Sequence, residues 1–282
     1  MRKAFLFTTI LLLEISFTSC DEEGNFRWLS NDRNVAGLKE ALTVGAKNAA
    51  GTLGSVNGYL GDEAVKILLP PEAQTALNTL KSVQAVRSQL VAIPIFGSAV
   101  AEFIPNLSPN FDDILLTAIN RAAEHAAPQS VDIFVNAITS MTISDATNIL
   151  FTDNNFAATD YLRANTSEGL QMAFSPIIDD SLDTVEVGDF TANSAWQFFA
   201  TQNNNLANFL DTSNPLLTSA VFAIVPEARN ISAVPTTLGG YVTGRALDGL
   251  FKKVEGEELK IRTDVNARTS KLLRDVFGQL DR

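Results

Sequence analysis

The sequence predicts an all-α protein, a single multi-helix domain that follows a cleaved lipoprotein signal peptide. Along most of the chain, apolar residues recur three and four positions apart, which is the period of an amphipathic helix. The strict alternation of a half-buried strand is scarce. With 46% hydrophobic and 19% charged residues in 282, the composition is that of a folded domain rather than a disordered chain.

The first 19 residues have the pattern of a signal peptide. Arg2 and Lys3 form a basic start, and the apolar run from Ala4 to Phe17 follows. This run is shorter than the roughly 18 to 20 apolar residues that a helix needs to cross a bilayer. We therefore expect residues 1–19 to be removed on export.

Cys20, the only cysteine, follows the small residues Thr18 and Ser19. The segment Phe17-Thr18-Ser19-Cys20 resembles the lipobox of bacterial lipoproteins, which implies that the Cys20 thiol is acylated. Several acyl chains exceed the two signals that stable membrane anchoring requires. The alternative is an ordinary secretory signal with a chance cysteine, but a lone thiol in an exported protein has no disulfide partner.

Three acids, Asp21, Glu22 and Glu23, come directly after Cys20. They resemble the acidic export signals with which some Gram-negative lineages place lipoproteins on the outer leaflet, whereas other lineages read an Asp at this position as inner-membrane retention. A solvated tether needs no receptor and is the other interpretation. We expect residues 20–34 to form a lipidated acidic tether and residues 35–282 the helical domain. The expected location is the cell envelope of a Gram-negative bacterium, at the outer membrane, facing the periplasm or the surface.

The net charge argues against two classes of partner. Loss of residues 1–19 takes away Arg2, Lys3 and Glu14 and changes the formal charge from −11 to −12. A chain this acidic repels nucleic acid and anionic lipid head groups. We therefore expect attachment to the membrane through the N-terminal acyl chains and no binding of nucleic acid.

The first helix is expected after the polar Ser30-Asn31-Asp32, with a stripe that begins at Val35. A glycine-rich stretch, residues 51–61, ends the pattern. Residues 65–69 are the one expected extended piece, and Pro71 then opens a helix towards Leu90.

Proline and small polar residues predict the starts of the middle helices. Ser108-Pro109 resembles an N-cap followed by proline at the first helical position, and Pro128 separates that helix from the next. Ser144 and Asn165 are candidate caps for two more helices, the second with Glu168 three positions later.

The last part of the chain predicts three more helices. An aromatic-rich helix follows Phe190, and residues 238–254 and 257–280 read as two further helices. We find neither a repeat nor a long linker that would divide the chain into two domains.

Six blocks of sequence occur in a characteristic order. They are Gly37-Leu38-Lys39-Glu40-Ala41-Leu42, Asn120-Arg121-Ala122-Ala123-Glu124, Ala157 to Ser167, Tyr241 to Phe251, Lys260-Ile261-Arg262 and Ala267-Arg268-Thr269-Ser270. Together, from about Val35 to Gly278, they resemble the bacterial lipoprotein family catalogued as domain of unknown function 4197. The resemblance implies an all-helical exported domain and no assigned activity. An enlarged, Asn- and Phe-rich region at residues 189–214 departs from the pattern.

The side chains needed for common enzyme chemistry are few. A Ser-His-Asp triad or a histidine-ligated zinc site needs properly placed imidazoles, and His125 is the only histidine in the chain. We expect His125 to be a hydrogen-bonded packing residue. The paired acids Asp112-Asp113 and Asp179-Asp180 with Asp183 do not follow a calcium-loop pattern. We expect no catalytic residue, metal or cofactor, although glycoside hydrolysis by two carboxylates stays open as an alternative.

A set of charged and aromatic side chains includes pairs at helical spacing, where they share one face. The set is Arg121, Glu124, Arg163, Tyr241, Arg245, Asp248, Glu258 and Arg262. Arg121 and Arg163 are the only basic residues between Pro105 and Ala228, so we expect both to find carboxylates. Two interpretations stand: structural ion pairs that fix how helices dock, or a polar site for an anionic head group.

The function expected from these patterns is that of a lipid-anchored envelope domain acting as a non-catalytic binding or assembly module, with an apolar ligand such as a lipid held between helices. A carboxylate hydrolase of the envelope and a scaffold for another envelope protein are the alternatives. An enclosed cavity lined by Phe and Leu would favour the ligand, two facing acids the hydrolase, and an exposed apolar patch the scaffold.

Overall fold

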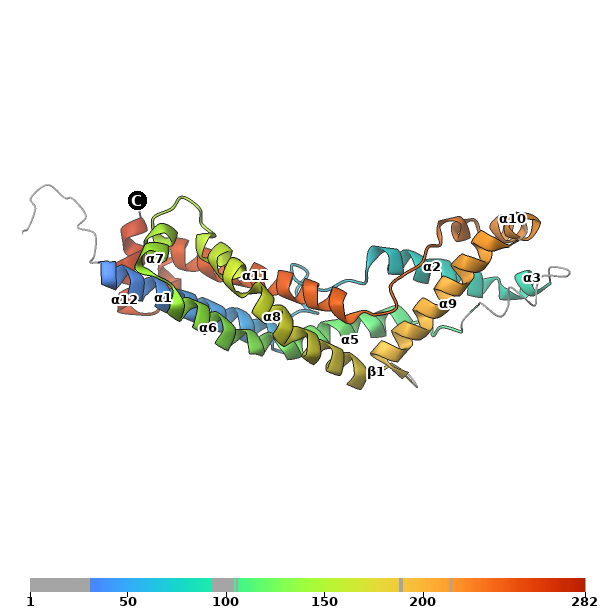
Figure 1. Ribbon diagram of the computed structural model, residues 1–282, viewed down its shortest axis with the longest axis horizontal. Coiled ribbons are helices and arrows are strands. Elements are labelled where there is room, and N and C mark those ends of the chain that lie inside the picture. The colour runs from blue at the N-terminus through green and yellow to red at the C-terminus, as the bar shows by residue number, and fades with distance from the viewer. Residues whose placement is uncertain (1–30, 93–103, 105, 188–189, 214, 282) are drawn as a thin grey trace, which may run out of the picture.

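The computed structural model describes residues 31–92, 104, 106–187, 190–213 and 215–281. The described chain is an elongated array of helices with one very short hairpin (Figure 1), so the expected all-α multi-helix fold is confirmed. The signal peptide, Cys20 and the acidic residues 21–23 lie outside the described residues.

The α-helices of the described chain differ widely in length. They are α1 (Asn31–Leu53), α2 (Pro71–Ala85), α3 (Arg87–Val91), α5 (Phe111–Ala126), α6 (Ser130–Ser140), α7 (Ile143–Leu150), α8 (Ala157–Thr184), α9 (Ala192–Thr212), α10 (Pro215–Ile224), α11 (Gly239–Thr263) and α12 (Lys271–Phe277). Short 3₁₀ turns are η1 (Ala127–Gln129), η2 (Pro226–Asn230), η3 (Val265–Ala267) and η4 (Gly278–Leu280). In the described chain no helix combines the length and the apolar character that a membrane span requires.

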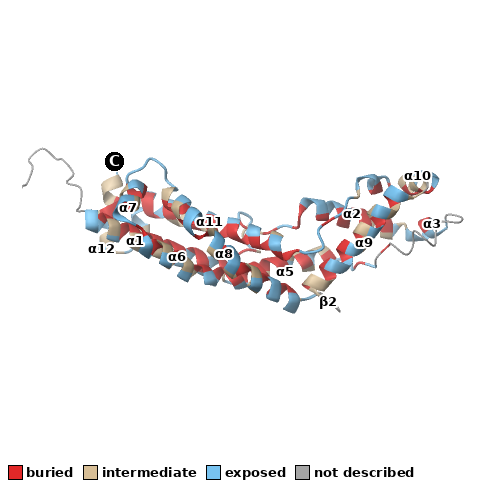
Figure 2. Ribbon diagram, in the orientation of Figure 1, coloured by how far each residue is buried: buried red, intermediate tan, exposed pale blue. Residues whose placement is uncertain are grey.

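The longer end of the molecule is a bundle in which α1, α8 and α11 pack with α5, α6, α7 and α12 (Figure 1). Buried residues follow the inner faces of these helices, and exposed residues face outward (Figure 2). Gly37 on α1 permits close packing on α12, because a Cβ there would lie 2.5 Å from the side chain of Val276.

The other end contains α2, α3, α9 and α10, and α5 extends towards it (Figure 1). The ring of Phe111, the first residue of α5, lies 6.1 Å from that of Phe199 on α9. Trp196 packs 5.3 Å from Phe199 and donates a hydrogen bond from Nε1 to the Pro235 carbonyl at 3.0 Å. This aromatic cluster joins the two ends through the core.

A minimal antiparallel hairpin connects α8 to α9. Its strands β1 (Glu186–Val187) and β2 (Phe190–Thr191) pair Glu186 with Thr191 and Val187 with Phe190. Thr191 then caps α9, because its hydroxyl accepts a hydrogen bond from the Ser194 amide.

Two expected helix caps are wrong. Ser144 lies inside α7, and the cap is Thr142, which forms a reciprocal capping box with Asp145. Asn165 lies inside α8, which begins eight residues earlier at Ala157. The helix after Ser108-Pro109 begins only at Phe111, and the Asn110 side chain makes no capping bond there.

Three expected boundaries also differ. The helix from Pro71 is interrupted at Val86, so that α2 and α3 replace one continuous helix. The stretch 257–280 is not one helix, because α11 runs on to Thr263 and the chain turns at Asp264, whose side chain accepts the Asn266 amide. Residues 31–34 of the expected tether already belong to α1.

Candidate functional site

Glu258 and Arg262 form a buried ion pair on α11. Arg262 donates from Nε to Glu258 Oε1 at 3.0 Å, and its Nη2 lies 2.9 Å from the same oxygen. Each side chain is only 4% exposed. The pair expected from the spacing of four residues is therefore confirmed, and it lies in the interior rather than on a solvated face.

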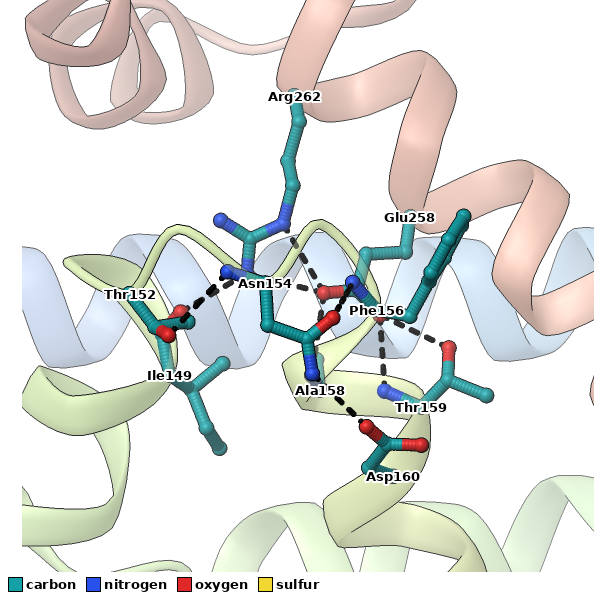
Figure 3. Close-up of polar contacts among 9 residues, drawn as sticks. All are labelled: Ile149, Thr152, Asn154, Phe156, Ala158, Thr159, Asp160, Glu258 and Arg262. Carbon is teal, nitrogen blue, oxygen red and sulfur yellow. Dashed lines mark hydrogen bonds and ion pairs between the residues drawn. The ribbon is translucent and has the colours of Figure 1, made fainter.

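The Glu258 carboxylate also caps the start of α8 (Figure 3). It accepts hydrogen bonds from the backbone amides of Ala158 at 3.0 Å and Thr159 at 2.8 Å, and from the Thr159 hydroxyl at 2.8 Å. The first amides of a helix lack partners within the helix, and a negative charge near them is favourable. Glu258, which lies on α11, thus takes the place of a local N-cap residue for α8.

The Arg262 guanidinium connects α11 to α7 but keeps one nitrogen available. Its Nη2 donates to the Ile149 carbonyl of α7 at 2.9 Å, while Nε and Nη2 contact Glu258. Among the described residues, Nη1 has no hydrogen-bond partner, and in Figure 3 one terminal nitrogen carries no dashed line. A buried guanidinium therefore has one donor group left for a ligand or water.

A polar cavity of about 740 Å³, which we call the end pocket, lies beside this guanidinium. Its polar lining includes Asn31, Thr152, Asp153, Asn155, Arg262 and Gln279. Phe151, which is 38% exposed, adds an aromatic ring to the lining. Its lining includes Asn31 at the start of α1 and Leu150 at the end of α7, which places the pocket at the end of the molecule where α7 and α12 lie (Figure 1).

The loop that forms one wall of the end pocket is held by its own side chains (Figure 3). The Thr152 hydroxyl accepts the Asn154 amide at 3.2 Å, and the Asn154 side chain accepts the Phe156 amide at 2.9 Å. Asn154 also donates to Asp160 at 2.9 Å. The wall is therefore organised before any ligand arrives.

Arg121 and Glu124 form a second polar cluster. They pair at 2.5 Å, and Arg121 Nη2 donates to the side chain of Asn57 at 3.0 Å. The other Glu124 oxygen accepts the backbone amides of Tyr59 and Leu60 at 3.2 and 3.3 Å. The pair holds the loop that follows α1, where Asn57 has a positive φ of 67°.

Tyr59 is the buried centre of the same loop. Its hydroxyl donates to the Ala246 carbonyl of α11 at 2.7 Å. Burial, and then the nearby Glu124 charge, raise the pKa of Tyr59 far above its usual value, so that the phenol stays protonated and remains a donor. This residue fixes the loop against α11 and performs no acid–base role at ordinary pH.

Asn120 was not expected as a site residue, yet it anchors the extended piece. Its side-chain amide accepts the Ile67 N–H at 2.9 Å and donates to the Ile67 C=O at 2.8 Å. The expected extended piece at 65–69 is thus present only in part: Val65 lies in a turn, and residues 66–69 follow as irregular chain held by a side chain instead of a second strand. Asn120 is fully buried on α5, and its place among apolar stripe positions was the one available signal.

Tyr241, Arg245 and Asp248 share one face of α11, as their spacing predicts. Arg245 lies 5.5 Å from the Tyr241 ring and 3.4 Å from Asp248. The Tyr241 hydroxyl donates to the Leu68 carbonyl at 3.0 Å. These side chains line an open groove of about 480 Å³ beside the extended segment.

The expected carboxylate partner of Arg163 is wrong for the described chain. Arg163 makes no ion pair with another described residue, and its guanidinium lies 4.3 Å from the centre of the Phe251 ring. A guanidinium over an aromatic face is attracted by the ring quadrupole and keeps its contact with water. Phe251 in turn packs edge-on against Phe134 at 5.8 Å, so Arg163 covers an aromatic core.

The sequence-predicted polar residues do not converge on one pocket. Arg262 borders the end pocket, Tyr241 lines the α11 groove, and Arg121 borders a third, shallower pocket. His125 hydrogen-bonds Ser181 at 3.1 Å but lies on the exposed side of α5 rather than in the core. Over the described residues, no group of three His, Cys, Asp or Glu side chains is placed to share a metal ion.

Comparison with known proteins identifies the family. The model of a family described as protein of unknown function, DUF4197, matches residues 28–95 and 99–278. No curated protein and no solved structure matches the chain. The family match includes the helices that build the end pocket and the α11 groove, and its second range also covers the Asn- and Phe-rich region. The chain belongs to the family of proteins of unknown function DUF4197.

Proposed function

We propose that this protein is a lipid-anchored, non-catalytic binding module of the cell envelope, and that its end pocket holds a hydroxyl-rich ligand, a saccharide. The observation that carries the proposal is the buried Arg262 guanidinium, whose Nη1 has no partner among the described residues and which borders a polar cavity of about 740 Å³.

The chemistry of the lining matches that of a sugar. Side-chain amides such as those of Asn31 and Asn155 both donate and accept hydrogen bonds, as sugar hydroxyls do. Because Glu258 and the Ile149 carbonyl already fix Arg262, little conformational freedom remains to be lost on binding.

Charge favours a neutral ligand over a strongly anionic one. The charge of Arg262 is balanced by Glu258, and Asp153 is the other charged residue in the lining. A multiply charged phosphate would meet no net positive field here. The anionic head group considered from the sequence is therefore less well matched than a polyol.

The geometry gives less support to an apolar ligand or to hydrolysis. A pocket lined mainly by apolar side chains such as Leu38 and Phe277 has a volume of only about 10 Å³, which is no more than one water needs. Glycoside hydrolysis requires two carboxyl groups about 5 to 9.5 Å apart, and among the described residues that line the end pocket Asp153 is the only carboxylate. The scaffold role stays a hypothesis.

The proposed anchor is the acylated Cys20 of the mature protein. Asn31, where α1 begins, is 11 residues beyond Cys20, so an extended tether spans at most about 40 Å. The end pocket would then lie near the membrane of a Gram-negative envelope, and we propose the outer membrane. For residues 21–23 both the sorting and the tether interpretations remain part of the proposal.

The anchor is tested by replacing Cys20. We expect Cys20→Ala to release the protein from the membrane fraction and to abolish incorporation of a clickable fatty acid, because each buried methylene contributes about 0.8 kcal/mol of membrane affinity. Ser19→Ala, which retains the thiol, is the matched control. Continued fatty-acid labelling of Cys20→Ala would show that the anchor is elsewhere.

The pocket is tested on a glycan microarray with residues 21–282. Asn155 is exposed and makes no hydrogen bond within the described chain, so it can be replaced at little cost to folding. We expect a defined set of glycans to bind, Asn155→Ala to weaken this binding about tenfold, and Asn155→Trp to abolish it by filling the pocket. Asn78→Ala, at an exposed position on α2, is the control. Binding unaffected by Asn155→Trp, or no glycan binding, would contradict the proposal.

A further inference from the structure

Residues 66–69 follow a turn in which the Val65 and Lys66 N–H groups donate to the Asp62 carbonyl, and they behave as an edge strand with one occupied side. Asn120 takes both the N–H and the C=O of Ile67, as a neighbouring strand would. In extended chain the main-chain groups of successive residues point to opposite sides. The groups of Lys66 and Leu68 therefore face away from Asn120, towards α11.

Contacts on the α11 side agree with this geometry. The Leu68 carbonyl accepts the Tyr241 hydroxyl at 3.0 Å. Within the described chain, the Leu68 N–H and the Lys66 C=O have no hydrogen-bond partner. Leu68 itself is 59% exposed, which leaves this stretch of backbone open to solvent. The Leu68 N–H and the Lys66 C=O are thus placed like the donor and the acceptor that the edge of a β-sheet offers to an added strand.

The α11 groove lies beside these free groups and has a basic rim. Lys66, Arg245 and Lys252 line the groove, and Asp248 is the only acid among the described residues of its lining. Lys66 pairs with Glu63, Arg245 with Asp248, and Lys252 with Glu255, each at 3.0 to 3.4 Å. In each pair at least one side chain is more than 60% exposed, so each contributes little and can open for another carboxylate.

We propose that the α11 groove docks an extended, acidic polypeptide segment of a partner protein by strand addition to Lys66 and Leu68. Main-chain hydrogen bonds to the free edge provide the register, and carboxylates on the partner meet the basic rim. Among the described residues, the groove shares no lining residue with the end pocket.

The binding test uses a phage-displayed library of random heptapeptides, selected on residues 21–282. We expect the enriched peptides to be acidic, to lack proline at alternate positions, and to lose binding at least tenfold when the amides facing the groove are N-methylated. Arg245→Glu with Lys252→Glu should abolish the binding. Lys47→Glu with Lys271→Glu makes the same change of charge at exposed positions away from the groove and should leave binding intact.

The edge itself is tested through the Leu68 amide. Leu68→Pro removes this free N–H, and because the amide has no hydrogen bond to lose within the described chain, we expect normal thermal melting. Binding of the selected peptide should fall at least tenfold, and in the wild type the peptide should protect the Leu68 amide from hydrogen exchange. Undiminished binding to folded Leu68→Pro, or full protection of that amide without peptide, would overturn the proposal.

Discussion

Replacing Glu258 with alanine removes a charge and a helix cap in one step. Arg262, 4% exposed, would be left without its carboxylate. The Ala158 and Thr159 amides at the start of α8 would lose their acceptor as well. The change affects the contacts of α11 with α7 and α8, and Leu150 of α7 and Arg262 of α11 both line the end pocket.

The expected loss of stability is large for one substitution. Removing one partner of a buried ion pair costs about 3 to 5 kcal/mol, and each buried donor left unpaired costs about 1 to 3 kcal/mol. These effects overlap, and water from the end pocket can reach Arg262 through its free Nη1. We therefore expect Glu258→Ala to lower the free energy of unfolding by about 3 to 5 kcal/mol, and Glu258→Gln, which keeps an acceptor for α8, by less.

Urea unfolding followed by circular dichroism at 222 nm measures the change. A double-mutant cycle of Glu258→Leu, Arg262→Met and the variant with both changes isolates the coupling, because two apolar residues are often tolerated where one unpaired charge is not. We expect the double variant Glu258→Leu with Arg262→Met to be more stable than Glu258→Ala. A loss below about 1 kcal/mol for Glu258→Ala, or additive effects in the cycle, would refute the reasoning.

Three further predictions concern other parts of the fold. Asn120→Ala should cost about 1 to 3 kcal/mol in urea unfolding, because two main-chain groups of the extended segment lose their partner; an unchanged midpoint would contradict the anchoring role. Gly249→Ala should lower the melting temperature despite a gain in helix propensity of about 1 kcal/mol, because the new Cβ would lie 2.7 Å from the buried Tyr59 ring. Gly244→Ala, whose Cβ would meet nothing within 4 Å, should raise the melting temperature. Equal shifts in melting temperature for the two variants would argue against close packing at Gly249. The hydrogen bond from Arg268 holds the pKa of Asp281 below its usual value, so this pair stabilises the fold above about pH 4 and loses its effect as the pH falls through the folded-state pKa. Asp281→Asn should therefore flatten the acid limb of a stability–pH profile. An unaltered acid limb would contradict the assignment.

Local patterns predicted most of the helices because each depends on apolar spacing within one stretch of chain. The stripe from Val35 and the aromatic positions around Trp196 both mark buried faces in the structure. The errors occur where a distant residue decides the outcome. Helix α8 begins at Ala157 because Glu258, a hundred residues away, caps it, and no signal near Asn165 carries that information.

The site residues follow the same division. Spacing predicted the pairs Arg121–Glu124 and Glu258–Arg262, because residues three or four apart meet on a helix whatever surrounds them. It did not predict that one pair would be buried, nor that Arg163 would stack on Phe251, because both outcomes depend on which helices meet in space. The end pocket combines segments from both ends of the chain and has no local signature.

The central claim, that the end pocket holds a saccharide, is tested most directly by native mass spectrometry of the protein purified from its own envelope. We predict a retained, hydroxyl-rich adduct on the wild type and on Asn78→Ala, and its loss from folded Asn155→Trp. An adduct that survives Asn155→Trp, or a retained lipid in place of a saccharide, would contradict the account.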